Sequence, residues 1–352
     1  MPTSSSAPSS APSSAPCPAP YPAPFPELRF VDTNGIRMGF ADTGAAAGMP
    51  VLFSHGFPEL SWSWRFQLPA LAAAGYRAIA PDQRGYGASS RPEAVEAYDM
   101  AQLTADLAGL LDALEIDRAI LCGHDWGGGV VWSMAQRYPE RVAGVIALNT
   151  PYGARPPMDP IELMRTMLGE DFYILQFQEP GRADAILLEH VASVFRLFYG
   201  RSDMTPEQFA ALPAEERALN MLDRVAAFAS ATALDPAAAP PLIIDDDALA
   251  VFTETFRRTG FTGGINWYRN ISRNWAASAD LPERIDVPAL MISAANDVVL
   301  TPAMTDGMED RVPDLEKHVI ADCGHWTQQE KPEETNALII DWLQRRFPVA
   351  AD

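Results

Sequence analysis

An aspartate flanked by small residues is the first feature of this sequence that could do chemistry. The motif Gly123-His124-Asp125-Trp126-Gly127 lies between a run typical of a buried strand and a helix-like stretch. Small flanking residues suit a tight, strained turn that presents a nucleophile, because larger side chains would collide with the neighbouring elements. The start of a helix favours an ionised carboxylate at Asp125, as nucleophilic attack requires. Gly128 and Gly129 are expected to let this helix pack closely. The motif alone also fits a plain turn in which Asp125 only caps the helix.

Two residues late in the chain could act as a base and its orienting acid. His325 follows a strand-like run at residues 315–320, and Asp297 follows another at 287–294. Open α/β sheets place their chemistry at such strand ends, and the order nucleophile, acid, histidine is the one expected with this type of turn. We therefore predict that Asp297 orients His325, which activates a water molecule. The remaining histidines are expected to be structural or solvated: His55, His124, His190 and His318.

A second loop could hold an oxyanion. The strand-like run at residues 50–54 leads directly into His55-Gly56-Phe57-Pro58. This is the place of the second oxyanion-hole loop in enzymes with such a nucleophile turn. The backbone N–H groups of Phe57 and Trp126 are the candidate donors.

An aspartate nucleophile restricts the reaction. It attacks an sp³ carbon and becomes an alkyl ester, so water must then attack the carboxyl carbon of Asp125 itself. Suitable leaving groups are the halide of a haloalkane and the oxygen of a strained epoxide ring. The epoxide oxygen leaves as a basic alkoxide and needs a proton donor, which a tyrosine with its usual pKa of about 10 can supply. Composition does not select that donor from the nine tyrosines.

The elements that must position these residues alternate along the chain. A hairpin around Asn34-Gly35 is expected within residues 28–40. Further strands are expected at residues 50–54, 76–80, 119–122, 142–148, 287–294 and 315–320. Helices are expected at residues 60–74, 100–114, 126–138, 302–309 and 333–346. Such alternation predicts parallel βαβ units with helices on both faces of the sheet.

The alternation is interrupted once, which suggests the domain organisation. Residues 151–277 are mostly helical in pattern, so a helical cap is predicted there, inserted into an α/β core formed by residues 27–150 and 278–352. Residues 1–26 are almost entirely Ser, Ala and Pro, with no basic or apolar region of a secretory signal. This tail is expected to be disordered.

Charge and composition exclude some functions. The net charge of −20 disfavours binding to nucleic acids or anionic membranes. No run approaches the roughly 20 apolar residues of a membrane-spanning helix. Three cysteines (Cys17, Cys122 and Cys323) form no disulfide framework, which favours a reducing, cytoplasmic setting.

Several motifs, in order, resemble those of soluble epoxide hydrolases of the α/β-hydrolase fold. The resemblance spans roughly residues 27–347 and rests on residues 55–59 with 63–65, 123–128, 177–181, 266–270, 296–298 and 323–328. It implies an α/β-hydrolase core with a mostly parallel sheet and an inserted helical cap, or lid, domain.

The resemblance also implies a role for each candidate residue. Asp125 is the nucleophile, His325 the base and Asp297 its orienting acid. Tyr173 and Tyr268 in the cap bind and protonate the epoxide oxygen. The amides of Phe57 and Trp126 form the oxyanion hole, and the Trp126 ring is expected to line the pocket. The implied reaction converts an epoxide and water into a vicinal diol through a hydroxyalkyl-Asp ester, without a cofactor or metal. A homodimer is compatible with this interpretation, and the identity of the epoxide stays open.

Two other functions stay open at this stage. A haloalkane dehalogenase shares the Asp nucleophile, often with an adjacent Trp, but the two cap tyrosines argue against it, since a departing halide needs N–H donors. A non-catalytic binding protein on the same fold would usually lack one or more of the catalytic residues, all of which are present here.

Overall fold

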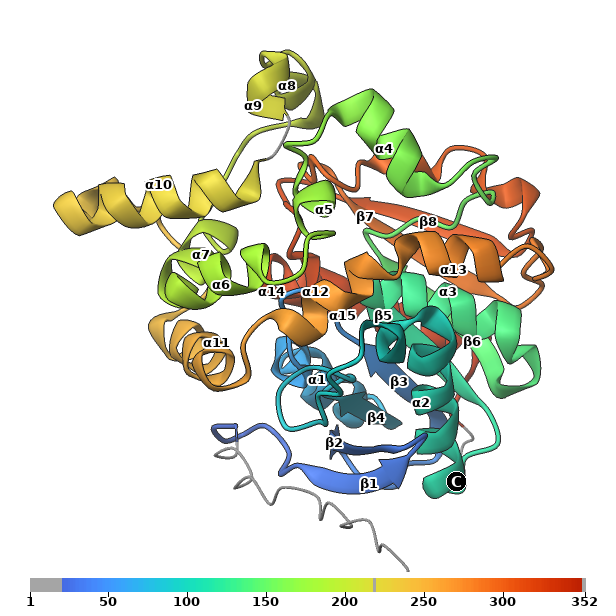
Figure 1. The fold of residues 1–352 in the computed structure, drawn as a ribbon. Coiled ribbons are helices and arrows are strands. Elements are labelled where there is room, and N and C mark those ends of the chain that lie inside the picture. The colour runs from blue at the N-terminus through green and yellow to red at the C-terminus, as the bar shows by residue number, and fades with distance from the viewer. Residues whose placement is uncertain (1–20, 218–219, 350–352) are drawn as a thin grey trace, which may run out of the picture.

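A single mixed sheet organises the molecule. The computed structural model describes residues 21–217 and 220–349. Within these residues the sheet has eight strands in the order β1-β2-β4-β3-β5-β6-β7-β8 (Figure 1). The strands are β1 (Arg29–Thr33), β2 (Ile36–Asp42), β3 (Gly48–Ser54), β4 (Tyr76–Pro81), β5 (Ala119–His124), β6 (Val142–Leu148), β7 (Ala289–Ala294) and β8 (Leu315–Ile320). The pairs β1–β2 and β2–β4 are antiparallel and the other pairs are parallel, which confirms the predicted mostly parallel sheet.

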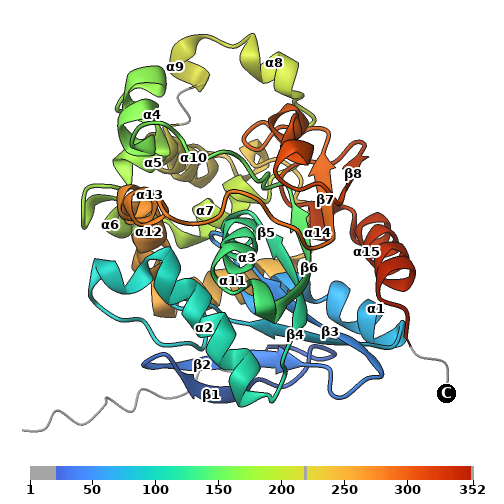
Figure 2. The same cartoon turned by 90° about the vertical axis from the view of Figure 1, so that its right-hand side faces the viewer.

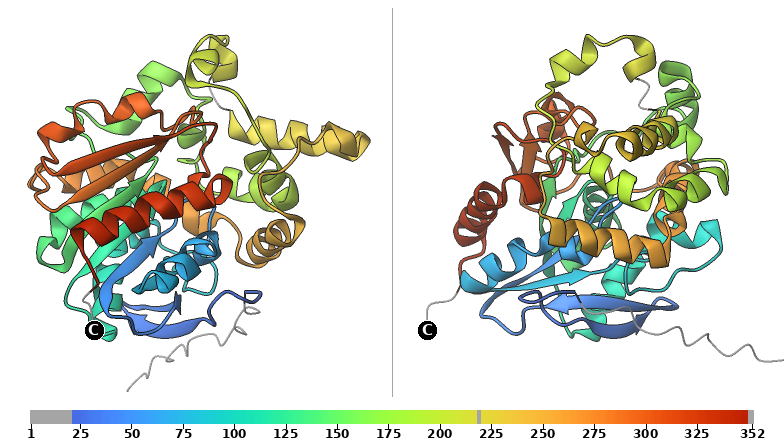
Figure 3. Two further views of the ribbon diagram at one scale, coloured as in Figure 1. Left: turned by 180° about the vertical axis from the view of Figure 1, so that it is seen from behind. Right: turned by 90° about the vertical axis from the view of Figure 1, so that its left-hand side faces the viewer.

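Helices cover both faces of this sheet. Helices α2 (Met100–Ala113) and α3 (Trp126–Arg137) lie on one face, and α1 (Gln67–Ala73) and α15 (Pro332–Arg346) lie on the other (Figures 2 and 3). The β1–β2 hairpin turns at Asn34-Gly35, where both residues have positive φ, as a two-residue hairpin turn of this type demands. The predicted α/β core is therefore confirmed.

The helical insertion lies between β6 and β7. Its α-helices are α4 (Pro160–Leu168), α5 (Tyr173–Gln176), α6 (Arg182–Glu189), α7 (Val191–Phe198), α8 (Pro206–Ala210), α9 (Ala214–Arg217), α10 (Met221–Leu234), α11 (Asp246–Thr259), α12 (Thr262–Arg269) and α13 (Ile271–Ala277). They gather to one side of the sheet as a cap (Figure 1). None of the helices in the described part of the chain is long and apolar enough to cross a membrane.

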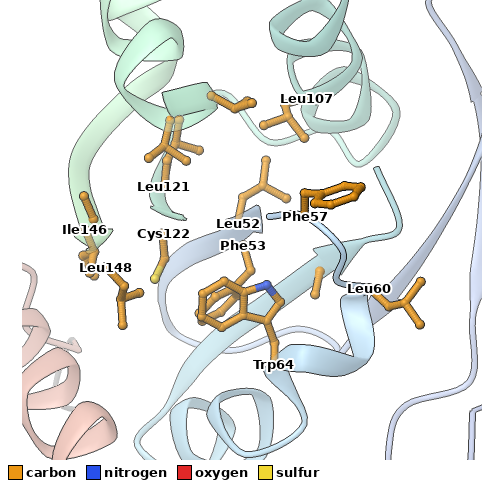
Figure 4. Close-up of a cluster of buried hydrophobic side chains, with 14 of the residues drawn as sticks. Leu52, Phe53, Phe57, Leu60, Trp64, Leu107, Leu121, Cys122, Ile146 and Leu148 are labelled. Atoms are coloured by element: carbon orange, nitrogen blue, oxygen red, sulfur yellow. The ribbon is translucent and has the colours of Figure 1, made fainter. Parts of the chain in front are cut away.

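The core between the layers explains why β3 and β5 read as apolar runs. Leu52 and Phe53 on β3 and Leu121 and Cys122 on β5 are completely buried (Figure 4). A parallel strand covered by helices on both faces buries successive residues rather than alternate ones. Burial of one such large apolar side chain stabilises the fold by about 1.5–3 kcal/mol. Strand β5, which leads directly into Asp125, is therefore firmly held.

Two predicted helices differ from the structure. Residues 60–74 form a 3-10 turn, η1 (Ser61–Trp64), and the separate helix α1. The backbone and side chain of Ser61 both donate hydrogen bonds to Asp82, and this local anchor fixes the turn. Residues 302–309 form two 3-10 turns, η5 (Pro302–Thr305) and η6 (Met308–Asp310), because the left-handed Gly307 interrupts a continuous helix.

Residues 21–26, which were predicted to belong to the disordered tail, contact the core in the structure. Residues 1–20 of the predicted disordered tail lie outside the described residues. The Tyr21 hydroxyl donates to both carboxylate oxygens of Asp82 at 2.9 Å, and Phe25 packs on Trp62 with ring centroids 5.1 Å apart. The two aromatic residues supply the apolar surface that Ser, Ala and Pro lack, and they attach this segment to the core.

Candidate active site

Asp125 occupies a strained turn between β5 and α3. Its φ of 51° and ψ of −123° are unusual for a non-glycine residue and cost on the order of 1–3 kcal/mol. A Cβ atom on Gly123 would overlap the backbone of Gly127, and one on Gly127 would overlap the backbone of Ser54. Both flanking positions therefore require glycine, for the steric reason that the sequence suggests.

The two following glycines differ from each other. A Cβ atom on Gly128 would lie 2.6 Å from the Cβ atom of Thr150, whose hydroxyl donates to the Asp125 carbonyl at 2.6 Å. Nothing lies within 4 Å of a Cβ atom placed on Gly129. The expected close packing is thus confirmed for Gly128 and wrong for Gly129.

The Asp125 carboxylate faces the predicted oxyanion loop. The Phe57 amide donates to Asp125 Oδ1 at 2.8 Å. Burial raises the pKa of Asp125, while attraction by His325 and the amides of Phe57 and Trp126 oppose that rise. The two predicted donors therefore lie at the carboxylate, which is poorly solvated yet hydrogen-bonded in its charged form.

His325 lies between two carboxylates. Its Nδ1 is 2.8 Å from Asp297 Oδ2, and its Nε2 is 3.8 Å from Asp125 Oδ2. Burial favours the neutral imidazole, but attraction by Asp297, the hydrogen bond to it and attraction by Asp125 outweigh burial and raise the pKa of His325 to about 9. The structure thus brings the three core residues of the prediction together.

Asp297 receives several hydrogen bonds besides the one with His325. The amides of Val299 and Leu300 each donate to its Oδ1 at 2.9 Å, and the Asn149 side chain donates to its Oδ2 at 2.8 Å. Burial alone would raise the pKa of Asp297, but His325 and the backbone donors hold it well below its usual range. The acid therefore stays ionised and fixes the imidazole.

Asn149 was missed in the sequence. It is completely buried, has a φ of 66°, and its Oδ1 accepts from the Thr327 hydroxyl at 2.7 Å. It therefore connects the acid to the loop that carries His325. Its place directly after a buried strand was the only available signal, and many structural asparagines share it.

Two cap tyrosines lie above the core residues. Tyr268 is on α12 and Tyr173 begins α5, and their rings lie 5.8 Å apart, centroid to centroid. Burial raises the pKa of each phenol, and the charge of Asp125 raises it further. Both phenols therefore stay protonated at neutral pH and can donate a proton.

One cavity joins these groups. It has a volume of about 230 Å³ and is lined by Asp125, His325, Tyr173 and Tyr268, with mostly apolar side chains around them. The Trp126 ring is not among the lining residues, contrary to expectation. It packs edge-on against Tyr268, with centroids 5.0 Å apart, and so supports that phenol from behind.

The other histidines have structural contacts. Nε2 of His55 accepts a hydrogen bond from the backbone N–H of Gln83 at 3.1 Å, which agrees with a structural role. His124 has a larger role than the sequence suggests. Its two ring nitrogens lie 2.7 Å from Glu59 Oε2 and 2.7 Å from the carbonyl oxygen of His325. His124 therefore connects the oxyanion loop with the base. His190 and His318 do not line the cavity.

Comparison with known proteins places the chain in two steps. Residues 49–332 match the family model of the alpha/beta hydrolase fold, which agrees with the sheet, the insertion and the nucleophile turn. The sequence is 45% identical to epoxide hydrolase A of Mycobacterium tuberculosis over 90% of this chain and 96% of that protein. It is 42% identical to the bifunctional epoxide hydrolase 2 of Mus musculus over 88% of this chain, which spans 54% of the mouse protein.

Solved structures agree with this placement. The crystal structure of epoxide hydrolase A from Mycobacterium thermoresistibile superposes with a TM-score of 0.81 at 41% identity, covering 92% of this chain and all of that chain. Epoxide hydrolase VrEH1 from Vigna radiata gives a TM-score of 0.78 at 32% identity, covering 91% of this chain and 98% of that chain. The chain therefore belongs to the epoxide hydrolases of the α/β-hydrolase fold.

Proposed function

We propose that this epoxide hydrolase converts its substrate into a vicinal diol through a covalent ester on Asp125. One observation carries the proposal: the Asp125 carboxylate lies in one cavity with a paired histidine and two protonated phenols. A nucleophile, a base and an acid are all needed for attack at an sp³ carbon whose leaving group is an alkoxide.

In the first step Asp125 Oδ2 attacks an epoxide carbon. Oδ1 is bound by the Phe57 amide, so Oδ2, which faces His325, is the oxygen left for attack. The new ester C–O bond forms while the ring C–O bond breaks. Tyr173 and Tyr268 bind the ring oxygen and deliver a proton to it, since both phenols are protonated at neutral pH.

In the second step water hydrolyses the ester. His325 takes a proton from water, and the resulting hydroxide attacks the carboxyl carbon of Asp125. The negative charge develops on Oδ1, which the Phe57 amide already binds, and the Trp126 amide at the same carboxylate is the second donor proposed to stabilise it. Collapse breaks the bond to the diol oxygen, which takes the remaining proton of the added water, and the Asp125 carboxylate is restored with one oxygen from water. His325 ends protonated, as in the resting enzyme, and the phenolate left by ring opening regains its proton through solvent from the proton that His325 lost when the ester formed.

Alkylation of Asp125 prepares His325 for this second step. In the resting enzyme two carboxylates hold the pKa of His325 at about 9, so the imidazole is protonated at neutral pH. The ester is uncharged, so the attraction by Asp125 disappears when it forms. The pKa of His325 then falls, so a larger fraction of the imidazole is neutral and can act as a base once the ester exists.

The alternatives carry less support. The relatives reported above are epoxide hydrolases, and a halide needs no proton from two phenols. Release of chloride from haloalkanes without diol formation from epoxides would favour the dehalogenase. A binding protein would need none of the groups that meet in the cavity.

The cellular setting and assembly remain predictions. Cys122 and Cys323 are buried, free thiols within the described residues, which is compatible with the proposed cytoplasmic setting. A homodimer, and the choice among aryl, alkyl and lipid epoxides, need direct measurement. The mostly apolar lining of the cavity favours apolar substituents on the epoxide.

The ester can be trapped and weighed. Replacing the base in His325→Gln should leave alkylation active but slow ester hydrolysis by about 10²–10⁴-fold. Rapid quenching and intact-protein mass spectrometry should then reveal enzyme plus one epoxide, located on the peptide that contains Asp125. His318→Gln, a histidine change on β8 outside the cavity, serves as the matched control and should turn over normally. Complete absence of the adduct in His325→Gln, with free epoxide still present, would contradict the proposal.

A further inference from the structure

Helix α12, which carries Tyr268, rests directly on the core segment between β4 and α2. The contact is between two backbones. A Cβ atom on Gly263 would lie 2.6 Å from the Gly85 Cα atom, and one on Gly85 would lie 2.9 Å from the Gly263 Cα atom. Gly85 also has a φ of 95°, which other residues rarely adopt. The three atoms nearest to a methyl group on Gly263 are all backbone atoms of Gly85, so no side chain can move aside there and the added carbon must separate the helix from the core.

Further contacts fix α12 along its length. The Trp267 indole donates to the carbonyl of Arg84 at 3.3 Å, and the Asn270 side chain donates to the carbonyl of Val95 at 2.6 Å. Both acceptors belong to residues 84–100, which we call the platform segment. The helix is thus attached to the platform segment by the Gly263 contact near its start and by these two hydrogen bonds at its end. Tyr268 lies between Trp267 and Asn270, the two residues that donate these bonds.

Helix α5, which carries Tyr173, is positioned less directly. Arg269 donates to the carbonyl of Phe177 at 2.9 Å, and the Gln178 side chain donates to the carbonyl of Tyr268 at 3.1 Å. These bonds join the α5 region to α12 rather than to the platform segment. The placement of Tyr173 therefore depends in part on the placement of α12.

We propose that Gly85, Gly263 and Asn270 are positioning residues for epoxide ring opening. Their contacts set the height of α12 above the core, and with it the distance of both phenols from Asp125. The proposal rests on the proposed function, in which those phenols protonate the ring oxygen. A displacement of about 1 Å can cost about 100-fold in rate, and the water-activating groups lie in the core, so ring opening should be affected selectively.

The variant Gly263→Ala tests this proposal. Alanine favours a helix more than glycine does, so any loss of rate reports the contact with Gly85 and not a weaker helix. In single-turnover experiments the alkylation rate constant should fall about 100-fold, while hydrolysis of the ester should stay within about 3-fold of wild type. A shift in which epoxide carbon is attacked is also expected. The control Gly153→Ala, where nothing lies within 4 Å of the new methyl group, should leave both steps unchanged.

A second variant keeps the test decisive if Gly263→Ala fails to fold. Asn270→Ala removes the hydrogen bond to the Val95 carbonyl of the platform segment, together with the bonds of this side chain to Asn266 and Arg273, and should slow alkylation about 10-fold with little effect on hydrolysis. A folded Gly263→Ala protein that alkylates at the wild-type rate would overturn the proposal. Equal slowing of both steps in either variant would overturn it as well. A wild-type enzyme that forms no ester would instead contradict the proposed function, so the two failures are distinguishable.

Discussion

The core half and the cap half of the active site are built differently. Asp125, Asp297 and His325 follow strands of one sheet, and each is fixed by hydrogen bonds within adjoining loops. Tyr173 and Tyr268 lie on helices of the insertion, and their position depends on contacts between cap and core. On the proposed mechanism the core alone carries ester hydrolysis, whereas ring opening needs both halves. Changes in the cap should therefore slow ring opening and leave ester hydrolysis unchanged. Changes in the core can slow ester hydrolysis while ring opening continues.

Removal of both phenols should produce the largest difference between the effects on ring opening and on ester hydrolysis. The double variant Tyr173→Phe with Tyr268→Phe lacks any proton donor for the alkoxide, so alkylation should fall by about 10⁴-fold or more. Stopped-flow tryptophan fluorescence can follow this step, because Trp126 packs against Tyr268. Tyr152→Phe removes a phenol whose hydroxyl bonds the carbonyl of Glu283, outside the cavity, and serves as the control. Alkylation at the wild-type rate in the double variant would show that another group supplies the proton.

The pH dependence of hydrolysis tests the core half. A protonated His325 is no base, so the hydrolysis rate should rise with pH as the imidazole loses its proton. The pKa is about 9 while Asp125 is charged, and the ester should lower it toward its ordinary value of about 6.5. Hydrolysis should therefore reach its plateau below pH 9.

A charge-neutral variant makes the same point without substrate. Asp125→Asn removes the charge that the ester also removes, so NMR titration should give a lower pKa for His325 in this variant than in wild type. Equal pKa values in the two proteins would remove the proposed link between alkylation and base activation.

Replacing Gly127 or Gly129, which follow the nucleophile, by alanine should have opposite effects on the stability of the fold. Gly127→Ala forces a methyl group against the backbone of Ser54 and should destabilise the fold by about 1–3 kcal/mol. Gly129→Ala has open space and should stabilise the fold by about 0.4–1 kcal/mol. Thermal or denaturant unfolding measures both. A destabilised Gly129→Ala protein would show that the start of α3 is under strain from another source.

The core was largely predictable from the sequence. Strands β5 and β7 are buried along their whole length, so they read as apolar runs, and Asp125 and Asp297 lie just beyond their ends. Strand β8, an edge strand with a single buried residue, precedes the loop that carries His325. The small residues around Asp125 reflect local sterics, which sequence spacing records. Helices with a regular apolar face, such as α2, were also predicted to within one residue.

The cap residues and the contacts that support the site were harder to predict from the sequence. The choice of Tyr173 and Tyr268 depended on resemblance, because a phenol in an aromatic helix has no pattern of its own. Asn149 and the contact between Gly85 and Gly263 join residues far apart in the chain, so no local signal marks them. Tyr21 and Phe25 were assigned to the disordered tail because their neighbours are Ala and Pro, although the Asp82 and Trp62 side chains hold them.

The central claim is that Asp125 donates its own oxygen to the product. A single turnover in ¹⁸O-labelled water, with enzyme in excess over epoxide, tests it most directly. The first diol should be unlabelled, and the label should instead appear in the carboxylate of Asp125, since water attacks the ester carbonyl. Label in the first diol, with none in Asp125, would mean that water opens the epoxide directly and that no ester forms.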